Sequence, residues 1–520
     1  MTALDWSVLI ASLVFIVAYG VWKGRKSRNL EGYLLAGRDM RWYTVALSIM
    51  ATQASAITFL STPGQAYADG MRFIQFYFGL PLAMVVLSIT AVPLYRRLKV
   101  YTAYEYLEGR FDLKTRLLGA FLFLIQRGLA CGLTIYAPAI ILATLMGWSL
   151  PRTILVIGVA VVIYTTSGGT RAVNHTNFQQ MLIILTGMGA AFVVLLLNLP
   201  EDVGVREATW VAGKMGRLNA IDLSFDWENR YNIWSGLLGG FFLALAYFGT
   251  DQSQVQRYLS GQSVAQSRLA LLFNGLVKVP MQVFILFIGA MVFAFYQFTT
   301  PPLFFNAEEV RSIERSAYAD EYRRLEQEHA RSSAEKEAAV RQLVEAMRAD
   351  EERAIERAEA RLAATQAEVL AVREEAIELF VRNDPDAART DTNYVFLTFV
   401  LDYLPAGLVG LVMAAIFAAA MSSTASELNA LASTTVVDFY RRLRGSERTD
   451  AHDVVVSKGA TLVWGAFAIG FAMFANRLGS LVEAVNILGS LFYGTILGIF
   501  LLAFYVKRVG GTAAFAGALA

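Results

Sequence analysis

Long apolar segments alternate with short polar junctions along most of the chain. Each segment has about 20 residues, the length a helix needs to cross a hydrocarbon core of about 30 Å. The pattern therefore predicts an all-α, polytopic membrane helix bundle. Eleven spans are expected, near residues 6–22, 42–62, 73–95, 117–146, 151–168, 178–198, 233–256, 271–297, 404–437, 457–477 and 480–505. The apolar stretch Gly510–Ala520 is too short to span, so we expect either a truncated chain or an incomplete last helix there.

Charges at the junctions predict the orientation of the bundle. The first span has Asp5 before it and cations after it, the reverse of the charge order in a signal peptide. Loops on the cytoplasmic side of a membrane are enriched in lysine and arginine. With the N-terminus outside, the cytoplasmic junctions carry Lys23, Arg25, Lys26 and Arg28, then Arg96, Arg97 and Lys99, then Arg171, Arg257, Arg441, Arg442, Arg444, Lys507 and Arg508. We therefore expect an integral protein of a bacterial inner membrane, in contact with lipid, with its N-terminus outside.

Composition argues against several other classes of function. The formal net charge of +2 indicates no nucleic-acid partner. Cys131 is the single cysteine, so no intramolecular disulfide can form. His175, His329 and His452 are scattered without metal-ligand spacing. We expect neither thiol chemistry nor metal chemistry, and the protein is not expected to be an enzyme.

One long segment differs from the rest of the chain. Between Pro302 and Pro385 there is no glycine or proline, and alanine, glutamate and arginine dominate, a helix-forming composition. A weak heptad seam runs through Ile355, Ala358, Leu362, Thr365, Val369, Val372, Ala376 and Leu379. Both ends must return to neighbouring membrane helices, so we expect a periplasmic helical hairpin that turns near Ser332–Ser333. It is either a solvated insertion without a role in transport or a docking surface for a partner protein or a second protomer.

Small and polar residues interrupt three of the apolar segments. The first cluster is Ser48–Thr58 and the second is Ala418–Ser426. Backbone inside a membrane can leave the helix only where it is buried in protein or lines a cavity, and the freed oxygens suit sodium. Neither cluster contains a carboxylate, which favours a monovalent ion over calcium or magnesium. The alternative is tight helix packing, for which small residues are equally suited.

The third cluster, Tyr247–Arg257, contains Asp251 and three glutamines. Such groups are unfavourable inside a membrane unless they face a cavity. Lys278 and Glu483 are charges embedded in two other spans. We hypothesise that Asp251 pairs with Lys278.

At these clusters the sequence resembles the sodium:solute symporter family, which includes carriers of proline, sugars, sialic acid, iodide and monocarboxylates. The fragments that carry the resemblance are Gly37-Arg38, Ile135–Pro138, Ser167–Val173, Gln254–Leu259, Ala420–Ser423 and Asn486–Gly494. The resemblance implies a LeuT-type fold, in which spans two to six and seven to eleven form a five-plus-five inverted repeat behind one extra N-terminal helix. The sequence itself shows no internal repeat.

The resemblance also implies a division of the chain and a set of site residues. The parts are residues 1–40 (first helix and cytoplasmic loop), 41–303 (first part of the transporter core), 304–391 (insert), 392–507 (second part of the core) and 508–520 (start of a further, incomplete span). The implied sodium ligands are Ala51, Ala54, Ala419, Ser422 and Ser423. The implied solute-binding residues are Gln53, Thr58, Gln75, Asp251, Ser253, Lys278 and Glu483.

Two departures from the family pattern concern coupling and gating. Many relatives carry an aspartate, linked to sodium coupling, where this chain has Asn177, so we expect one sodium ion per cycle. Some relatives have an aromatic gate after the glutamine that is Gln252 here, and this chain has Ser253 there.

The predicted function is sodium-coupled symport of a small organic solute, such as a sugar, polyol or carboxylate, into the cell by alternating access. The ion required is Na⁺. The alternative is a transporter-like solute sensor that signals through a partner bound by the insert 304–391.

Overall fold

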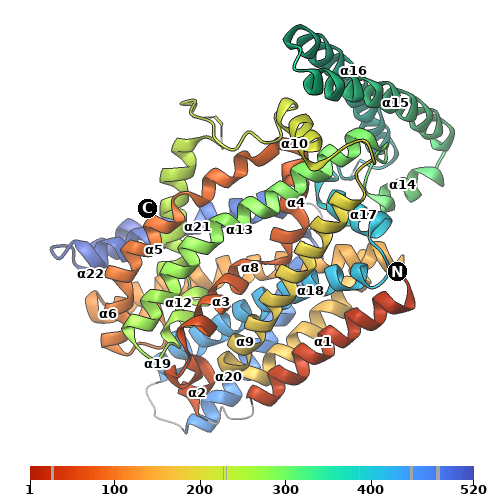
Figure 1. Ribbon diagram of the computed structural model, residues 1–520. Coiled ribbons are helices and arrows are strands. Elements are labelled where there is room, and N and C mark those ends of the chain that lie inside the picture. The colour runs from red at the N-terminus through yellow and green to blue at the C-terminus, as the bar shows by residue number, and fades with distance from the viewer. Residues whose placement is uncertain (25–28, 227, 230, 386, 445–448, 476–480) are drawn as a thin grey trace.

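The computed structural model describes residues 1–24, 29–226, 228–229, 231–385, 387–444, 449–475 and 481–520, and these form a helix bundle (Figure 1). An isolated bridge between Met40 and Gly261 is the one β-type pairing among them. The helices of the first half are α1 (Ala3–Gly24), α2 (Leu30–Leu35), η1 (Ala36–Arg38), α3 (Trp42–Gln53), α4 (Ala56–Asp69), η2 (Gly70–Tyr77), α5 (Leu80–Ile89), α6 (Ala91–Leu98), α7 (Ala103–Arg110), α8 (Leu113–Met146), α9 (Leu150–Leu197) and α10 (Val205–Lys214). Those of the second half are η3 (Ser235–Gly239), α11 (Gly240–Gly249), α12 (Gln252–Leu259), α13 (Val264–Phe298), α14 (Ala307–Glu314), α15 (Ala319–Ala349), α16 (Glu352–Asn383), α17 (Thr392–Tyr403), α18 (Leu408–Thr434), η4 (Thr435–Arg441), α19 (Arg442–Arg444), α20 (Asp450–Ala472), α21 (Leu481–Tyr505) and α22 (Gly511–Leu519).

Many of these helices have the dimensions of membrane spans. Within the described residues, eight helices are long and apolar enough to cross a membrane: Ala3–Gly24, Thr58–Leu98, Leu113–Ile140, Gly168–Leu197, Val264–Phe298, Leu408–Arg444, Asp450–Ala472 and Ile487–Tyr505. Two shorter apolar helices, Leu150–Ile163 and Ser235–Gly249, lie in further predicted spans. Exposed apolar side chains lie on the outer helices α1 and α20, as at Ile10, Val14 and Val463. Exposure of these apolar faces to water is unfavourable, whereas contact with lipid is not.

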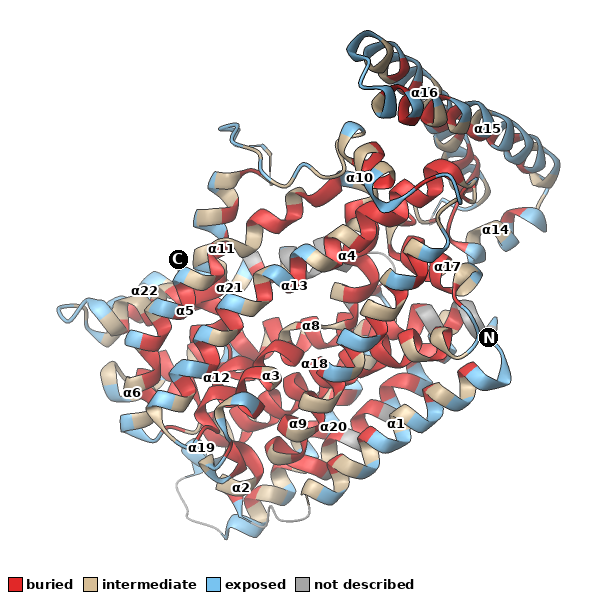
Figure 2. Ribbon diagram, in the orientation of Figure 1, coloured by how far each residue is buried: buried red, intermediate tan, exposed pale blue. Residues whose placement is uncertain are grey.

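Helix α18 forms the centre of the bundle. Every residue from Val412 to Thr434 is buried, and α1, α3, α8, α9 and α20 pack around it (Figure 2). The run Ala418–Ala420 has side chains small enough for neighbouring backbones to approach closely. The second polar cluster of the sequence therefore lies at the centre of the protein.

The fifth and sixth predicted spans are both part of α9, whose helical backbone is interrupted at Gly169. Gly169 has φ +61° and ψ −178°, and a Cβ at this position would lie 2.7 Å from a ring carbon of Tyr33. Glycine is therefore required there both for the backbone conformation and for the close approach. The residues after it, which the sequence placed in a junction, are helical, and Asn174 and Asn177 are fully buried.

The insert is a helical hairpin of α15 and α16, and its predicted turn was placed wrongly. The chain turns at Asp350–Glu351, where Asp350 takes the left-handed conformation with φ +56°. Aspartate tolerates this conformation better than most residues. Ser332 lies inside α15, and its hydroxyl donates to the Glu328 carbonyl at 3.0 Å. The heptad seam is buried as predicted at Ala358, Leu362, Val369, Val372, Ala376 and Leu379.

Ion pairs attach the hairpin to the bundle. Arg348 meets Glu207 at 3.2 Å, and Lys214 meets Glu359 at 2.7 Å, so both pairs join the hairpin to α10. At the base of the hairpin, Arg373 pairs with Asp391, the residue before α17. Figure 1 shows the N-terminus at the same end of the bundle as the hairpin, with α2, α6 and α19 at the opposite end. Arg25, Lys26 and Arg28 of the first cationic junction lie outside the described residues.

Candidate functional site

The second predicted span is broken at the first polar cluster. Helix α3 ends at Gln53, Ala54 and Ser55 are non-helical with ψ values of 73° and 169°, and α4 begins at Ala56. The last regular bond before the break runs from the Ala54 amide to the Met50 carbonyl at 2.8 Å. Beyond it, the carbonyls of Ala51 and Thr52 lose their usual amide partners four residues ahead. The break thus presents free backbone oxygens in the middle of the bundle.

Two serines of α18 meet these oxygens. The Ser422 hydroxyl lies 2.9 Å from the Ala51 carbonyl and 2.8 Å from the Ala419 carbonyl. The Ser423 hydroxyl donates to the Thr52 carbonyl at 3.0 Å. Residues far apart in sequence therefore place five oxygens within a few ångströms. Ala54, the remaining predicted sodium position, is fully buried at the break itself.

Asn177 lies directly beside these oxygens. Its side-chain amide donates to the hydroxyls of Ser48 at 3.1 Å and Thr52 at 3.3 Å. The Thr52 hydroxyl is in turn 2.9 Å from that of Ser426 on α18. Thr52 thus links Asn177 to the serine pair. The Thr52 carbonyl accepts from the Ser423 hydroxyl, and the Thr52 hydroxyl accepts from the Asn177 side-chain amide. The group is uncharged throughout.

A second helix break lies at the third polar cluster. Helix α11 ends at Gly249, and α12 begins at Gln252 after an extended Asp251 (φ −76°, ψ 119°). Tyrosine hydroxyls satisfy the carbonyls at the break: Tyr95 donates to Gly249 and Tyr104 to Thr250, both at 2.9 Å. Asp251 caps α12 by accepting from the Ser253 amide at 2.9 Å and from its hydroxyl at 2.6 Å.

The hypothesis that Asp251 pairs with Lys278 is wrong. The partner of Asp251 is Arg127 of α8, which also donates to Glu427 at 3.0 Å and to the Tyr493 hydroxyl at 2.7 Å. The Tyr493 hydroxyl in turn donates to Asp251 at 3.2 Å. We call Arg127, Asp251 and Glu427 the buried triad.

Lys278 lies elsewhere in the core. Its ammonium has no hydrogen-bond partner among the described residues and sits 5.8 Å from the centre of the Tyr77 ring. The side chain is fully buried in α13. Among the described residues, the Tyr77 ring therefore offers its charge a cation–π attraction.

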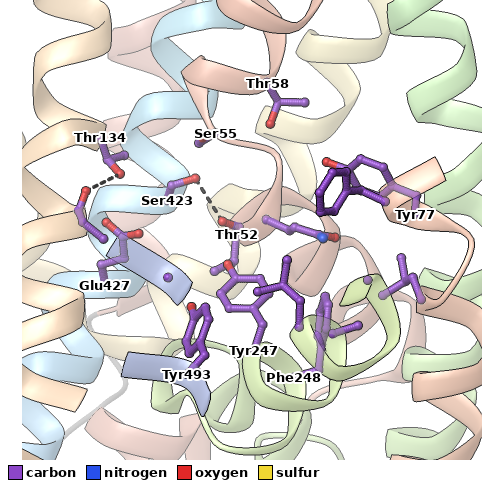
Figure 3. A pocket seen from close by; sticks show the side chains of 18 of the residues that line it. Thr52, Ser55, Thr58, Tyr77, Thr134, Tyr247, Phe248, Ser423, Glu427 and Tyr493 are labelled. Carbon is purple, nitrogen blue, oxygen red and sulfur yellow. Dashed lines mark hydrogen bonds between the residues drawn. The ribbon is translucent and has the colours of Figure 1, made fainter. Parts of the chain in front are cut away.

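A cavity of about 200 Å³ lies between the first break and α11 (Figure 3). Gln53 and Thr58, two of the predicted solute-binding residues, line it, and so does Ser423 of the serine pair. Figure 3 shows Ser423, Glu427 and Thr134 on one side and Tyr77 on the other. The aromatic lining residues are Phe73, Phe76, Tyr77, Tyr247, Phe248 and Tyr493. The wall therefore offers flat apolar faces together with a few polar groups, the usual character of a small-molecule site.

The other predicted site residues support the surroundings of the cavity. Gln75 donates to the Tyr231 carbonyl at 2.8 Å and accepts from the Asp222 amide at 3.0 Å, so it anchors the loop that precedes η3. Gln252 donates to the Tyr101 carbonyl at 2.8 Å and thereby holds the segment before α7. The side chain of Glu483 lies outside the described residues.

Sequence reasoning missed two members of the buried triad, Arg127 and Glu427. Both stand inside apolar runs, at 117–146 and 404–437, where a charge is unfavourable unless it is paired in the protein interior. The presence of a charged residue inside an apolar run could therefore have identified both of them. Among the residues that the structure describes, no group of three or more His, Cys, Asp or Glu side chains could hold a metal ion.

Comparisons with known proteins identify the family. A model of the "Sodium:solute symporter family" matches residues 33–309 and 376–520, and the unmatched residues between them lie in the insert. A putative sodium-dependent multivitamin transporter of Drosophila melanogaster is 28% identical over 99% of this chain and 73% of its own length. The human sodium/iodide cotransporter is 26% identical over 99% of this chain and 68% of its own length. Human sodium-coupled monocarboxylate transporter 1 is 27% identical, with coverages of 99% and 71%.

A solved structure supports the same fold. The substrate-bound, outward-open structure of a Na⁺-coupled sialic acid symporter superposes with a TM-score of 0.75 at 23% identity, covering 99% of this chain and 90% of that chain. The predicted all-helical, polytopic membrane bundle is thereby confirmed and shares its fold with this symporter, whereas the five-plus-five inverted repeat stays a prediction. The chain belongs to the sodium:solute symporter family, as its resemblance indicated, and it is a sodium-coupled solute transporter and not an enzyme.

Proposed function

We propose that one sodium ion binds between the break in α3–α4 and the serine pair of α18, and that the solute binds in the adjoining cavity. The ligands are the carbonyls of Ala51, Ala54 and Ala419 and the hydroxyls of Ser422 and Ser423. The observation that carries the proposal is the Ser422 hydroxyl, which lies within 2.9 Å of both the Ala51 and the Ala419 carbonyls. All five ligands are neutral oxygens, which suits a monovalent cation.

This arrangement can become a sodium site through rotation of two hydroxyl hydrogens. Each serine hydroxyl has one hydrogen to donate and lone pairs to offer. Without an ion, the hydroxyls donate to the carbonyls; with an ion, the hydrogens turn away and all the oxygens face it. The ion then replaces two hydrogen bonds as the link between the α3–α4 break and α18.

Binding of sodium is proposed to favour the outward-open state and so to couple ion and solute. An ion can shift the equilibrium between two conformations only by its difference in affinity for them. This site joins α3–α4 to α18, so movement of one against the other changes that affinity. At about −100 mV, each inward sodium charge contributes about 2.3 kcal/mol. One ion could therefore concentrate a neutral solute about fifty-fold from the voltage alone.

The proposed solute is a small polar organic molecule, such as a sugar, a polyol or a carboxylate. Gln53 and Thr58 line the cavity, and the side-chain oxygen of Gln53 has no partner among the described residues. That oxygen is available to a donor of the solute. We assign Gln75, Asp251, Ser253 and Lys278 to holding the cavity walls. Three relatives are named as transporters of multivitamins, iodide and monocarboxylates, which supports a small solute for this chain as well.

The coupling ratio is proposed to be one sodium per cycle. Asn177 occupies the position beside the ion where a carboxylate could have balanced a second cation, and its amide already donates to Ser48 and Thr52. A neutral amide cannot compensate another buried charge. Gln252 is proposed to act at the gate by holding the segment before α7 against α12.

We also propose the orientation and the place of the insert. The N-terminus and the hairpin share one end of the bundle, and the cation-bearing α6 and α19 lie at the other (Figure 1). The positive-inside rule then implies that the hairpin and the N-terminus lie on the periplasmic side of the inner membrane. Residues 304–391 there are available for a protein partner or for self-association.

Transport in proteoliposomes tests this function against the sensor alternative. We expect an inward sodium gradient to drive accumulation of a solute first identified by thermal-shift screening of sugars, carboxylates and amino acids with and without sodium. Gln53→Ala removes one hydrogen bond to the solute and should raise its half-saturating concentration about tenfold. Gln65→Ala, in the following helix α4 and bonded to Asp69, is the matched control and should transport normally. Sodium-dependent binding without any uptake would favour the sensor.

A further inference from the structure

The buried triad carries an excess negative charge that the solute-binding scheme does not explain. Arg127 contributes one positive charge, and Asp251 and Glu427 contribute two negative charges. The Asp251 carboxylate is fully engaged, since it accepts from Arg127, Tyr493 and both donors of Ser253. The excess charge therefore resides on Glu427.

Glu427 is only half engaged. One carboxylate oxygen accepts from Arg127 at 3.0 Å, whereas the other has no hydrogen-bond partner among the described residues. The residue is 5% exposed. Thr134 and Cys131 of α8 face the same carboxylate, but the Thr134 hydroxyl donates to the Ala130 carbonyl at 3.2 Å, and a thiol is only a weak donor. A buried carboxylate oxygen in this condition is unfavourable unless a positive charge lies close to it.

The proposed sodium site, one helical turn away on α18, is a place where such a charge can lie. Glu427 follows Ser423 by four residues on α18, so the two side chains lie on one face, about one turn or ~6 Å apart along the axis. Both line the same cavity (Figure 3). The sodium ligands themselves are all neutral, so the ion brings a full buried charge that they do not balance.

We propose that Glu427 is the counter-charge of the sodium ion, an affinity-determining residue that is not itself a ligand. This inference rests on the proposed sodium site. With sodium bound, the ion and Arg127 balance Asp251 and Glu427, so the charges of these four groups sum to zero. Without sodium, the buried triad keeps one negative charge and attracts the cation.

The chain permits a clean test because Arg127 keeps a partner when Glu427 is neutralised. Glu427→Gln preserves the shape and an acceptor oxygen for Arg127, and the Arg127–Asp251 pair stays balanced. Asp438→Asn is the matched control: it neutralises another fully buried carboxylate further along the same chain, paired with Arg116 at 2.8 Å. Arg116 retains Glu108 at 2.8 Å in that variant.

The measurement is the thermal stability of the full-length protein during a titration of NaCl against choline chloride at constant ionic strength. A ligand at concentration c that binds only the folded state raises the free energy of unfolding by RT ln(1 + c/Kd), so the dependence of stability on sodium concentration reports affinity and not basal stability. We expect Glu427→Gln to raise the half-saturating sodium concentration at least about tenfold, about 1.4 kcal/mol. Glu427→Asp, which keeps the charge, should fall between the variant and the wild type, and Asp438→Asn should match the wild type.

A Glu427→Gln protein with wild-type sodium affinity would overturn the inference, and Glu427→Ser is judged by the same criterion if the glutamine variant does not fold. Ser422→Ala/Ser423→Ala separates this failure from that of the site itself. If the serine variant loses the sodium response and Glu427→Gln keeps it, only the counter-charge is wrong. If the serine variant keeps the response, the proposed sodium site is wrong and the inference falls with it.

Discussion

Replacing Ser422 and Ser423 together by alanine should abolish sodium-dependent uptake at physiological sodium concentrations. The change removes two of the five proposed ligands, and it leaves the carbonyls of Ala51 and Thr52 without their present donors. Each oxygen contact to a charged group is worth about 1.5 kcal/mol or more, so sodium affinity should fall about 100-fold or more. The measurement is initial uptake in proteoliposomes as a function of external sodium.

Thr424→Ala is the matched control for this variant. Thr424 is the next residue of α18, is equally buried, and its hydroxyl has no hydrogen-bond partner among the described residues. Its loss should leave the sodium dependence unchanged. Unaltered sodium dependence in the double serine variant would contradict the assignment of the site.

Removal of Arg127 should have the largest effect on stability. Arg127→Met leaves the Asp251 and Glu427 carboxylates in the protein interior without a cation, and breaking a buried ion pair in this way costs about 3–5 kcal/mol. We expect a markedly lower melting temperature and no measurable uptake. Thermal unfolding of the detergent-solubilised protein measures the first effect, and proteoliposome transport measures the second.

Lys278→Met distinguishes this account from the rejected pairing of Asp251 with Lys278. The Lys278 ammonium has no hydrogen-bond partner among the described residues, so replacing it by an apolar side chain of similar length should be neutral or stabilising. A Lys278→Met protein as unstable as Arg127→Met would show that the lysine balances a buried carboxylate after all.

Local composition predicted the helix breaks well, for a physical reason. A membrane helix can open only where small residues allow close approach and polar groups replace the lost bonds. The clusters around Ala51–Ser55 and Thr250–Ser253 satisfy both conditions within a few residues. The serine and tyrosine partners of these breaks come from distant segments. Composition singled out the cluster Ala418–Ser426 that contains Ser422 and Ser423, but only the family resemblance paired these two serines with Ala51 and Ala54.

The pairing of buried charges was beyond sequence reasoning. Asp251 lies in a predicted span, as do both Lys278 and Arg127, and nothing local distinguishes the two cations as partners. The choice depends on which helix faces the α11–α12 break, and α8 does so with Arg127. Attention to every charge inside an apolar run would have included Arg127 and Glu427 among the candidates, although not their arrangement.

The turn of the insert shows a limit of a different kind. In a sequence without glycine or proline, two adjacent serines were the most conspicuous weak helix formers. Serine is tolerated within a helix when its hydroxyl bonds back to the preceding turn, as Ser332 does. The turn lies instead at Asp350, which divides the hairpin into two helices of nearly equal length, 31 residues in α15 and 32 residues in α16.

The most direct test of the central claim is an experimental structure determined with sodium bound, compared with one in choline. In the sodium structure, we expect ion density in contact with the carbonyls of Ala51, Ala54 and Ala419 and with the hydroxyls of Ser422 and Ser423. In the choline structure, this density should be absent. Density for sodium at another position, with the Ser422 and Ser423 hydroxyls still donating to the Ala51 and Thr52 carbonyls, would contradict it.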